Sequence, residues 1–288
     1  EEAHCISQWG FEFRPDYLYA IGELRRRCRT PDNLSHFLFF SATVTNATLE
    51  DIKKEAGISS DEHFKIRPEE ILHPIQPFIH LESEDVQGEL YGTGITSARL
   101  GFIEKKIKAT DLNKSAVIIF VTRKRHAEEL YELLTQSVKD GNLADYTVIR
   151  YFHAGLTATE RAGIYEEYRN RKVNVLVCTK AFGMGMDISH IHRSIHLASP
   201  SYLEDYLQEV GRTGRGEEDR KKAGLTSVHC DLLYDRSDLD ENNSKIMGSR
   251  ISFDLLVSLW DNLTSVARKD AHSHQNLCVI PSKKYLGL

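Results

Sequence analysis

Three polar side chains near residue 210 recur at a spacing that suits phosphate binding. Gln208, Arg212 and Arg215 occupy positions i, i+4 and i+7, which share one face of a predicted helix. Each guanidinium carries planar, paired N–H donors that match the oxygens of a triphosphate. Gly211 and Gly214 add no side chain to this end of the helix, so a ligand can approach its backbone closely. A solvated basic helix end is the alternative interpretation of the same pattern.

Two adjacent carboxylates, Glu1 and Glu2, open the run Glu1-Glu2-Ala3-His4. After a strand, such a pair can divide the work of phosphoryl transfer, one carboxylate holding Mg²⁺ and the other polarising the attacking water. The pair alone is a weak signal, and a solvated N-terminus is its simpler explanation.

Aromatic and basic side chains follow directly. Trp9, Phe11 and Phe13 fall within five residues and precede Arg14. A loop of this composition can stack nucleic-acid bases and contact a phosphate. A satellite hydrophobic cluster fits the same residues.

These residues need elements to position them, and the surrounding chain alternates between strand and helix. Continuous β-branched runs predict buried parallel strands, and Thr157 with Glu160 predicts a capped helix start. The glycine-containing run 179–187 follows one such strand, at the sheet edge where α/β proteins bind ligands. The pattern predicts a doubly wound α/β domain from about residue 81 to residue 228. The predicted strands are 116–121, 146–151, 173–178 and 194–197, and the predicted helices are 127–134 and 157–168.

Composition marks further parts on either side of this domain. A buried strand is predicted at 34–40, and three prolines between 66 and 77 indicate a linker. One face of a predicted helix over 252–263 carries leucines and a tryptophan. The predicted parts are 1–73, the C-terminal part of a first α/β domain, 74–232, the second domain, and 233–288, a small, mostly helical extension.

The 288 residues include 37 Lys and Arg against 42 Asp and Glu, a net charge of −5. This balance excludes a uniformly basic protein that coats polyanions, so any nucleic-acid site is a local patch. No apolar run long enough to span a bilayer and no signal peptide are recognised, so no membrane partner is expected. Five scattered cysteines predict reduced thiols and a cytoplasmic protein, nucleoid-associated or nuclear according to the organism. His190 and His192 are interpreted as ordinary surface histidines.

Taken in order, these motifs resemble the superfamily 2 helicases, and specifically the RecQ family. Residues 1–4 resemble its DEAH box, and residues 5–10 continue into its aromatic-rich loop. The likeness covers about residues 1–228, with order and spacing kept throughout. The other matching segments are 41–43 (motif III), 118–123 (motif IV), 151–156 (the HAGL segment), 179–187 (motif V) and 208–215 (motif VI).

The resemblance implies two RecA-like domains that close on ATP and Mg²⁺, bind single-stranded and duplex DNA, and move along it 3′ to 5′ while unwinding the duplex. It implies that Glu2 orients the attacking water, Glu1 holds Mg²⁺, and Arg212 and Arg215 are arginine fingers. It implies the first RecA-like domain as a partner and leaves other protein partners unknown. Further implied roles are ATP binding for Gln208, Gly185 and Asp187, nucleic-acid binding for Trp9, Phe11, Phe13, Arg14, His153 and Thr179, and coupling for His4, Ser41 and Thr43.

The sequence departs from the family pattern in three ways. The phosphate loop G-x-x-x-x-G-K-[S/T] is absent, so we expect a fragment that does not hydrolyse ATP alone. Glu1 stands where the family has Asp, and the extra methylene moves the carboxylate by about 1 Å. Only Cys230 and Cys278 remain for the family's four-cysteine module, so zinc is not expected.

Two alternatives stay open. Motifs III and VI also suit RNA helicases of the DEAD and DEAH groups, although the aromatic stretch after the box favours DNA. A non-catalytic RecA-like module that binds nucleic acid is the other alternative, and the intact pair Arg212 and Arg215 argues against it.

Overall fold

The structure is a computed structural model that describes residues 3, 6, 15–30, 33–34, 38–41, 46–58, 78–85, 90, 94–183, 186–200, 203–238 and 240. The chain divides into two compact units, 1–242 and 243–288. The predicted helix over 252–263 lies outside the described residues.

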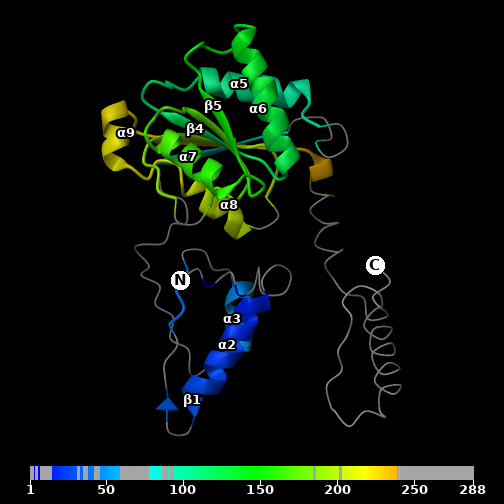
Figure 1. Ribbon diagram of the computed structural model, residues 1–288, viewed down its shortest axis with the longest axis vertical. Coiled ribbons are helices and arrows are strands. Elements are labelled where there is room, and N and C mark those ends of the chain that lie inside the picture. Colours follow the sequence, from blue (N-terminus) through cyan, green and yellow to red (C-terminus); the bar gives the residue numbers. More distant parts are fainter. Residues whose placement is uncertain are drawn as a thin grey trace. The chain divides into compact units, whose positions relative to one another are not determined.

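A six-stranded sheet forms the centre of the larger folded region (Figure 1). Every neighbouring pair of strands in it is parallel. This arrangement confirms the predicted doubly wound α/β fold. In sheet order the strands are β3 (Ile79–Asp85), β8 (Val228–Tyr234), β7 (Ile191–His196), β4 (Ala116–Phe120), β6 (Val175–Cys178) and β5 (Ile149–Phe152).

Strand β4 shows why the sheet is covered on both faces. All five of its residues are buried. Because strand side chains alternate between faces, Val117 and Ile119 join one core cluster while Ile118 and Phe120 join another. Helices α5 (Ser97–Lys108) and α6 (Lys124–Lys139) cover the first face, and α7 (Ala158–Arg169) and α8 (Leu203–Val210) cover the second (Figure 1).

Helix α7 begins as the sequence predicts. The Thr157 hydroxyl accepts the Glu160 backbone N–H, and the Glu160 carboxylate accepts the Thr157 backbone N–H. The Thr157 hydroxyl also donates to this carboxylate at 2.7 Å, and this bond, with the one from the Thr157 N–H, lowers the pKa of the Glu160 carboxyl. Both orphan donors at this helix start are therefore satisfied locally.

The N-terminal residues form a separate small cluster. Helix α2 (Pro15–Cys28) and helix α3 (Asn46–Ala56) are its main elements, with a two-stranded pair of β1 (Arg29–Thr30) and β2 (Asn33–Leu34). Its apolar centre contains Ala3, Ile6 and Ile52, with Ile21 and Phe39 packed against them.

The predicted buried strand over 34–40 is wrong for the residues that the structure describes. Strand β2 ends at Leu34, and residues 38–41 have no regular structure. Leu38 is 77% exposed and Phe40 is 61% exposed, whereas Phe39 packs against the small cluster. An apolar run is buried on both faces only between neighbouring strands, and no described strand pairs with residues 38–41.

The end of the sheet domain is fixed by a buried ion pair. Strand β8 continues to Tyr234, two residues past the predicted boundary at 232. Beyond it, the Asp238 carboxylate lies 3.0 Å from the Arg99 guanidinium of α5, and both side chains are fully buried. Arg99 also donates to the backbone carbonyl of Leu197. This pair ties the exit of the chain to the helix layer.

Cys178 and Cys230 are free and buried within the sheet. Burial raises the pKa of both thiols, so they stay protonated. Among the described helices, we find none with the length and apolar composition that a bilayer crossing requires.

His190 and His192 are buried, so their assignment as surface histidines is wrong. His190, directly before β7, is 4% exposed, and His192, within β7, is 3% exposed; the strand is buried along its whole length. The His192 Nδ1 atom lies 2.8 Å from the Ser115 hydroxyl, and the His190 ring packs beside Tyr168. A central strand buries both of its faces whatever its residue types, and this position was not visible from the local sequence.

These two histidines predict a pH-dependent stability. Burial lowers the pKa of each to about 4, and Arg171 lowers both while Asp219 raises both. Because the unfolded histidines bind protons near pH 6.5, their stabilisation is complete above that pH and is lost as the pH falls toward 4. The expected loss is up to about 3 kcal/mol per histidine. Urea unfolding at about pH 7 and about pH 4.5 measures it.

The substitution His192→Asn supplies the control, because an amide can bond the Ser115 hydroxyl without titrating in this range. The variant should lose less stability on acidification than the wild type. An identical pH dependence in the two proteins would assign the acid sensitivity to other groups.

Candidate nucleotide and nucleic-acid edge

The carboxyl ends of six parallel strands share one edge, where α/β domains bind ligands. The order of the strands along the chain changes direction around β4, which lies between β6 and β7. A crevice is expected at such a switch point. The loops that leave β4, β5 and β6 there carry the predicted motif IV, the HAGL segment and motif V, in that order.

The predicted helical stripe of Gln208, Arg212 and Arg215 is wrong, because α8 ends at Val210. The chain then forms a turn in which the Arg212 N–H bonds the Glu209 carbonyl at 3.2 Å. Only Gln208 therefore lies on the helix, while both arginines project from the turn that follows it.

Gly214 explains why the helix cannot continue. Its φ of +74° is left-handed, and its N–H donates to the Ile191 carbonyl at 2.7 Å. A Cβ at this position would lie 3.0 Å from both Phe78 and Val228. The prediction that Gly214 leaves room for a ligand is therefore wrong: the space is filled by protein.

The two arginines differ in their surroundings. Arg212 is 8% exposed, and its Nη1 donates to the Met186 carbonyl at 3.3 Å. Arg215 is exposed; its Nε donates to the Gly211 carbonyl at 2.9 Å, and its Nη1 lies 3.9 Å from Asp187. The alternative of a solvated basic end therefore does not describe Arg212. The structure brings the described parts of motifs V and VI together.

The ends of β5 and β6 bring His153 and Thr179 close to each other. The Thr179 N–H donates to the Phe152 carbonyl at 3.1 Å. His153 is buried, and its Nδ1 accepts the Gly155 N–H at 3.1 Å. Its Nε2 lies 3.0 Å from Glu128, so we assign the ring proton to Nε2. Contact of His153 and Thr179 with nucleic acid stays a prediction.

Sequence reasoning assigned no role to Lys124, the first residue of α6. A Cβ on Gly155 would lie 3.4 Å from the Lys124 Cδ, so the lysine stem lies along the HAGL loop. Its position directly after Arg123 in motif IV is the signal that could have identified it. This basic side chain stands at the same sheet edge as His153 and Thr179.

Several predicted site residues cannot be placed from the structure. Ser41 is described and half-buried, beside Phe40, whose carbonyl accepts the Ala3 N–H at 2.9 Å. The predicted roles of the others stay predictions. The residues outside the described part of the chain are Glu1, Glu2, His4, Trp9, Phe11, Phe13, Arg14, Thr43 and Gly185.

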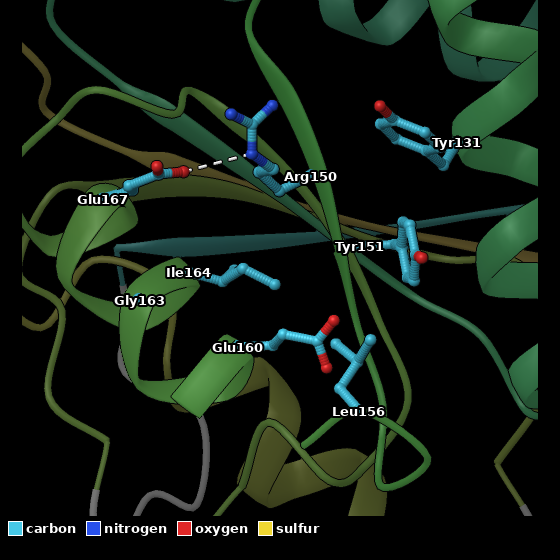
Figure 2. Close-up of a pocket in the computed structure, with 8 residues that line it drawn as sticks. All are labelled: Tyr131, Arg150, Tyr151, Leu156, Glu160, Gly163, Ile164 and Glu167. Atoms are coloured by element: carbon cyan, nitrogen blue, oxygen red, sulfur yellow. Dashed lines mark hydrogen bonds and ion pairs between the residues drawn. The ribbon is translucent and has the colours of Figure 1, made fainter. Parts of the chain in front are cut away.

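A shallow cavity of about 280 Å³ lies along the outer edge of β5, between α6 and α7 (Figure 2). Tyr131 and Tyr151 approach it from one side, with ring centroids 5.1 Å apart. On the other side Arg150 pairs with Glu167 at 3.1 Å. The cavity contains none of the predicted catalytic or ATP-binding residues, so it is distinct from the site built by motifs V and VI.

Comparison with known proteins agrees with this geometry. Residues 100–217 match the model of the helicase conserved C-terminal domain. The chain is 31% identical over 243 residues to the human protein named ATP-dependent DNA helicase Q4. It is 29% identical over 240 residues to the Bacillus subtilis protein named ATP-dependent DNA helicase RecQ. Over most of its length the chain is similar to RecQ-like helicases.

The chain spans only part of the length of these relatives. The matches cover 81% and 83% of the chain but only 18% of the human protein and 34% of the bacterial one. Among solved structures, yeast Dbp5 bound to RNA and ADP BeF3 matches 93% of this chain and 61% of Dbp5, with a TM-score of 0.55. At 18% identity this likeness supports the RecA-like fold alone.

Proposed function

We propose that this chain supplies the second RecA-like domain of an ATP-dependent DNA helicase that unwinds duplex DNA 3′ to 5′. The observation that carries the proposal is the contact between motifs V and VI, where Arg212 is buried against the Met186 carbonyl. The names of the RecQ-like relatives support DNA as the substrate. The part of the motor that holds the phosphate loop would lie in the longer protein.

The donors on the turn after α8 fit the phosphates of ATP. Arg212 and Arg215 stand three residues apart on this turn and offer planar N–H pairs. Partial burial strengthens the interaction of Arg212 with an anion, because little water surrounds it. Bound ATP would supply the free energy of its hydrolysis, and Arg212 would donate to the oxygens on which negative charge develops.

For Mg²⁺, the described residues contain no group of three or more histidines, cysteines or carboxylates that could hold a metal ion. From this domain, Arg212 and Arg215 would contribute guanidinium donors. We place Mg²⁺ binding with Glu1, as the family resemblance implies.

Movement along DNA would follow from closure of two RecA-like domains around ATP and their reopening after hydrolysis. In this domain, Lys124 and the loops after β5 and β6 would hold the phosphates of one strand. Contact of Arg212 with ATP on closure would also affect this sheet, because the turn that carries Arg212 is hydrogen-bonded to β7 through the Gly214 N–H.

The full-length protein that contains this chain tests the proposal. We expect it to hydrolyse ATP faster when single-stranded DNA is added, and to unwind a DNA duplex with a 3′ tail in preference to one with a 5′ tail. A matched RNA duplex distinguishes the RNA-helicase alternative. Preferential unwinding of RNA, or DNA binding with no ATP hydrolysis, would contradict the proposal and support one of the two alternatives.

A further inference from the structure

The side chain of His196 lies in a closed aromatic site at the carboxyl end of β7. Its ring stacks on Phe120 of the neighbouring strand, with centroids 5.0 Å apart and an angle of 20° between the planes. The Tyr206 ring of α8 meets it at 4.8 Å in an edge contact. His196 is 1% exposed, so its orientation is fixed by packing.

Among the described residues, the only polar side chain that bonds this ring is Glu209, whose carboxylate lies 3.0 Å from Nε2. The Nδ1 atom is buried and has no hydrogen-bond partner in the described part of the chain. A proton on Nδ1 would therefore be buried without an acceptor, so the ring carries its proton on Nε2 and donates it to Glu209.

Glu209 is also hydrogen-bonded to the backbone of Arg212. It lies in the last turn of α8, and its backbone carbonyl accepts the Arg212 N–H at 3.2 Å. A continuous set of contacts thus runs from Phe120 in the centre of the sheet, through His196 and Glu209, to the backbone of Arg212. The hydrogen bond from Nε2 to Glu209 holds the end of α8 at the point where the turn begins.

We propose that His196 is a positioning residue for Arg212, acting through Glu209 to hold the end of α8 against β7. The inference rests on the proposed function, because it assigns to His196 an effect on ATP hydrolysis. It predicts that loss of the His196–Glu209 hydrogen bond disturbs the placement of Arg212 and leaves the sheet intact.

The test uses the full-length protein and the substitution His196→Phe, which keeps the stacked ring and removes the N–H donor. We expect kcat for DNA-stimulated ATP hydrolysis to fall roughly tenfold while KM for ATP changes by less than about threefold. His196→Gln returns an amide donor near the position of Nε2 and should recover part of the lost kcat. Glu209→Met breaks the same bond from the other side and should match His196→Phe, which keeps the test open if one variant does not fold.

A double-mutant cycle with Arg212→Ala separates positioning from general damage. If His196 acts through Arg212, adding His196→Phe to Arg212→Ala should lower kcat by less than about twofold further. Ser115→Ala is the matched control, because it removes the partner of another buried histidine, His192, at the opposite end of the same strand. This control should leave kcat within about twofold of the wild type.

Two results would overturn the inference alone: a wild-type kcat in both bond-breaking variants, or an equal loss of kcat with and without Arg212. If the wild-type protein shows no DNA-stimulated ATP hydrolysis, or if Arg212→Ala retains it, the proposed function fails and the inference falls with it. Measurement of the wild type and Arg212→Ala first therefore tells the two failures apart.

Discussion

Replacing Arg212 with alanine in the full-length protein is expected to lower kcat for DNA-stimulated ATP hydrolysis by at least about 10³-fold, the lower range for arginine fingers. KM for ATP should change far less, because the guanidinium acts on charge that develops in the transition state. Steady-state ATPase assays with saturating single-stranded DNA measure both constants. Retention of more than about a tenth of the wild-type kcat would contradict the role of Arg212.

Arg215 gives a graded comparison. It is exposed and its nearest acidic neighbour, Asp187, lies 3.9 Å away, so its position is less tightly held than that of Arg212. We expect Arg215→Ala to reduce kcat less than Arg212→Ala does. Lys222→Ala removes an exposed cation on helix α9 (Glu217–Ala223) and serves as the control for charge alone, with no expected change in kcat.

The second large effect concerns stability. Asp238→Leu should lower the free energy of unfolding of the sheet domain by about 3–5 kcal/mol, because it leaves the fully buried Arg99 charge without its carboxylate. Urea unfolding at neutral pH measures the loss from the shift in midpoint. Asp240→Ala is the matched control, since this exposed carboxylate should contribute less than about 0.5 kcal/mol.

Removing both charges should restore much of the stability. Burial raises the pKa of Asp238 even though Arg99 opposes the shift, so the carboxylate is more costly to bury than its partner can offset. The double variant Arg99→Met with Asp238→Leu should therefore be more stable than Asp238→Leu alone. Equal destabilisation in the two proteins would show that shape at this position, and not the unpaired charge, is what matters.

Local sequence predicted a strand and a helix start that leave clear signals in their own residues. Strand β4 follows from a continuous apolar run, and the start of α7 follows from Thr157 and Glu160, which bond each other within one turn. The segment 34–40 is also rich in apolar residues, but unlike β4 its described residues 38–41 have no strands on either side, which a local pattern does not reveal. For the same reason the burial of His190 and His192 was missed.

The candidate site was predictable in its residue types and less so in its geometry. Arg212 was identified from spacing and resemblance. The predicted continuation of the helix to Arg215 was wrong, because the left-handed conformation of Gly214 is incompatible with a helix. His196 carries no signal in the sequence around it. Its importance emerges only from the packing of β4, β7 and α8 around its ring.

The affinity for a transition-state analogue tests the placement of Arg212 most directly. ADP with aluminium fluoride mimics the transferring phosphoryl group, whereas ADP alone lacks that group. In the full-length protein, Arg212→Ala should weaken binding of the analogue by about 100-fold or more and change ADP affinity by less than about threefold. Equal changes for the two ligands, or no change for either, would contradict a guanidinium placed at the reacting phosphate.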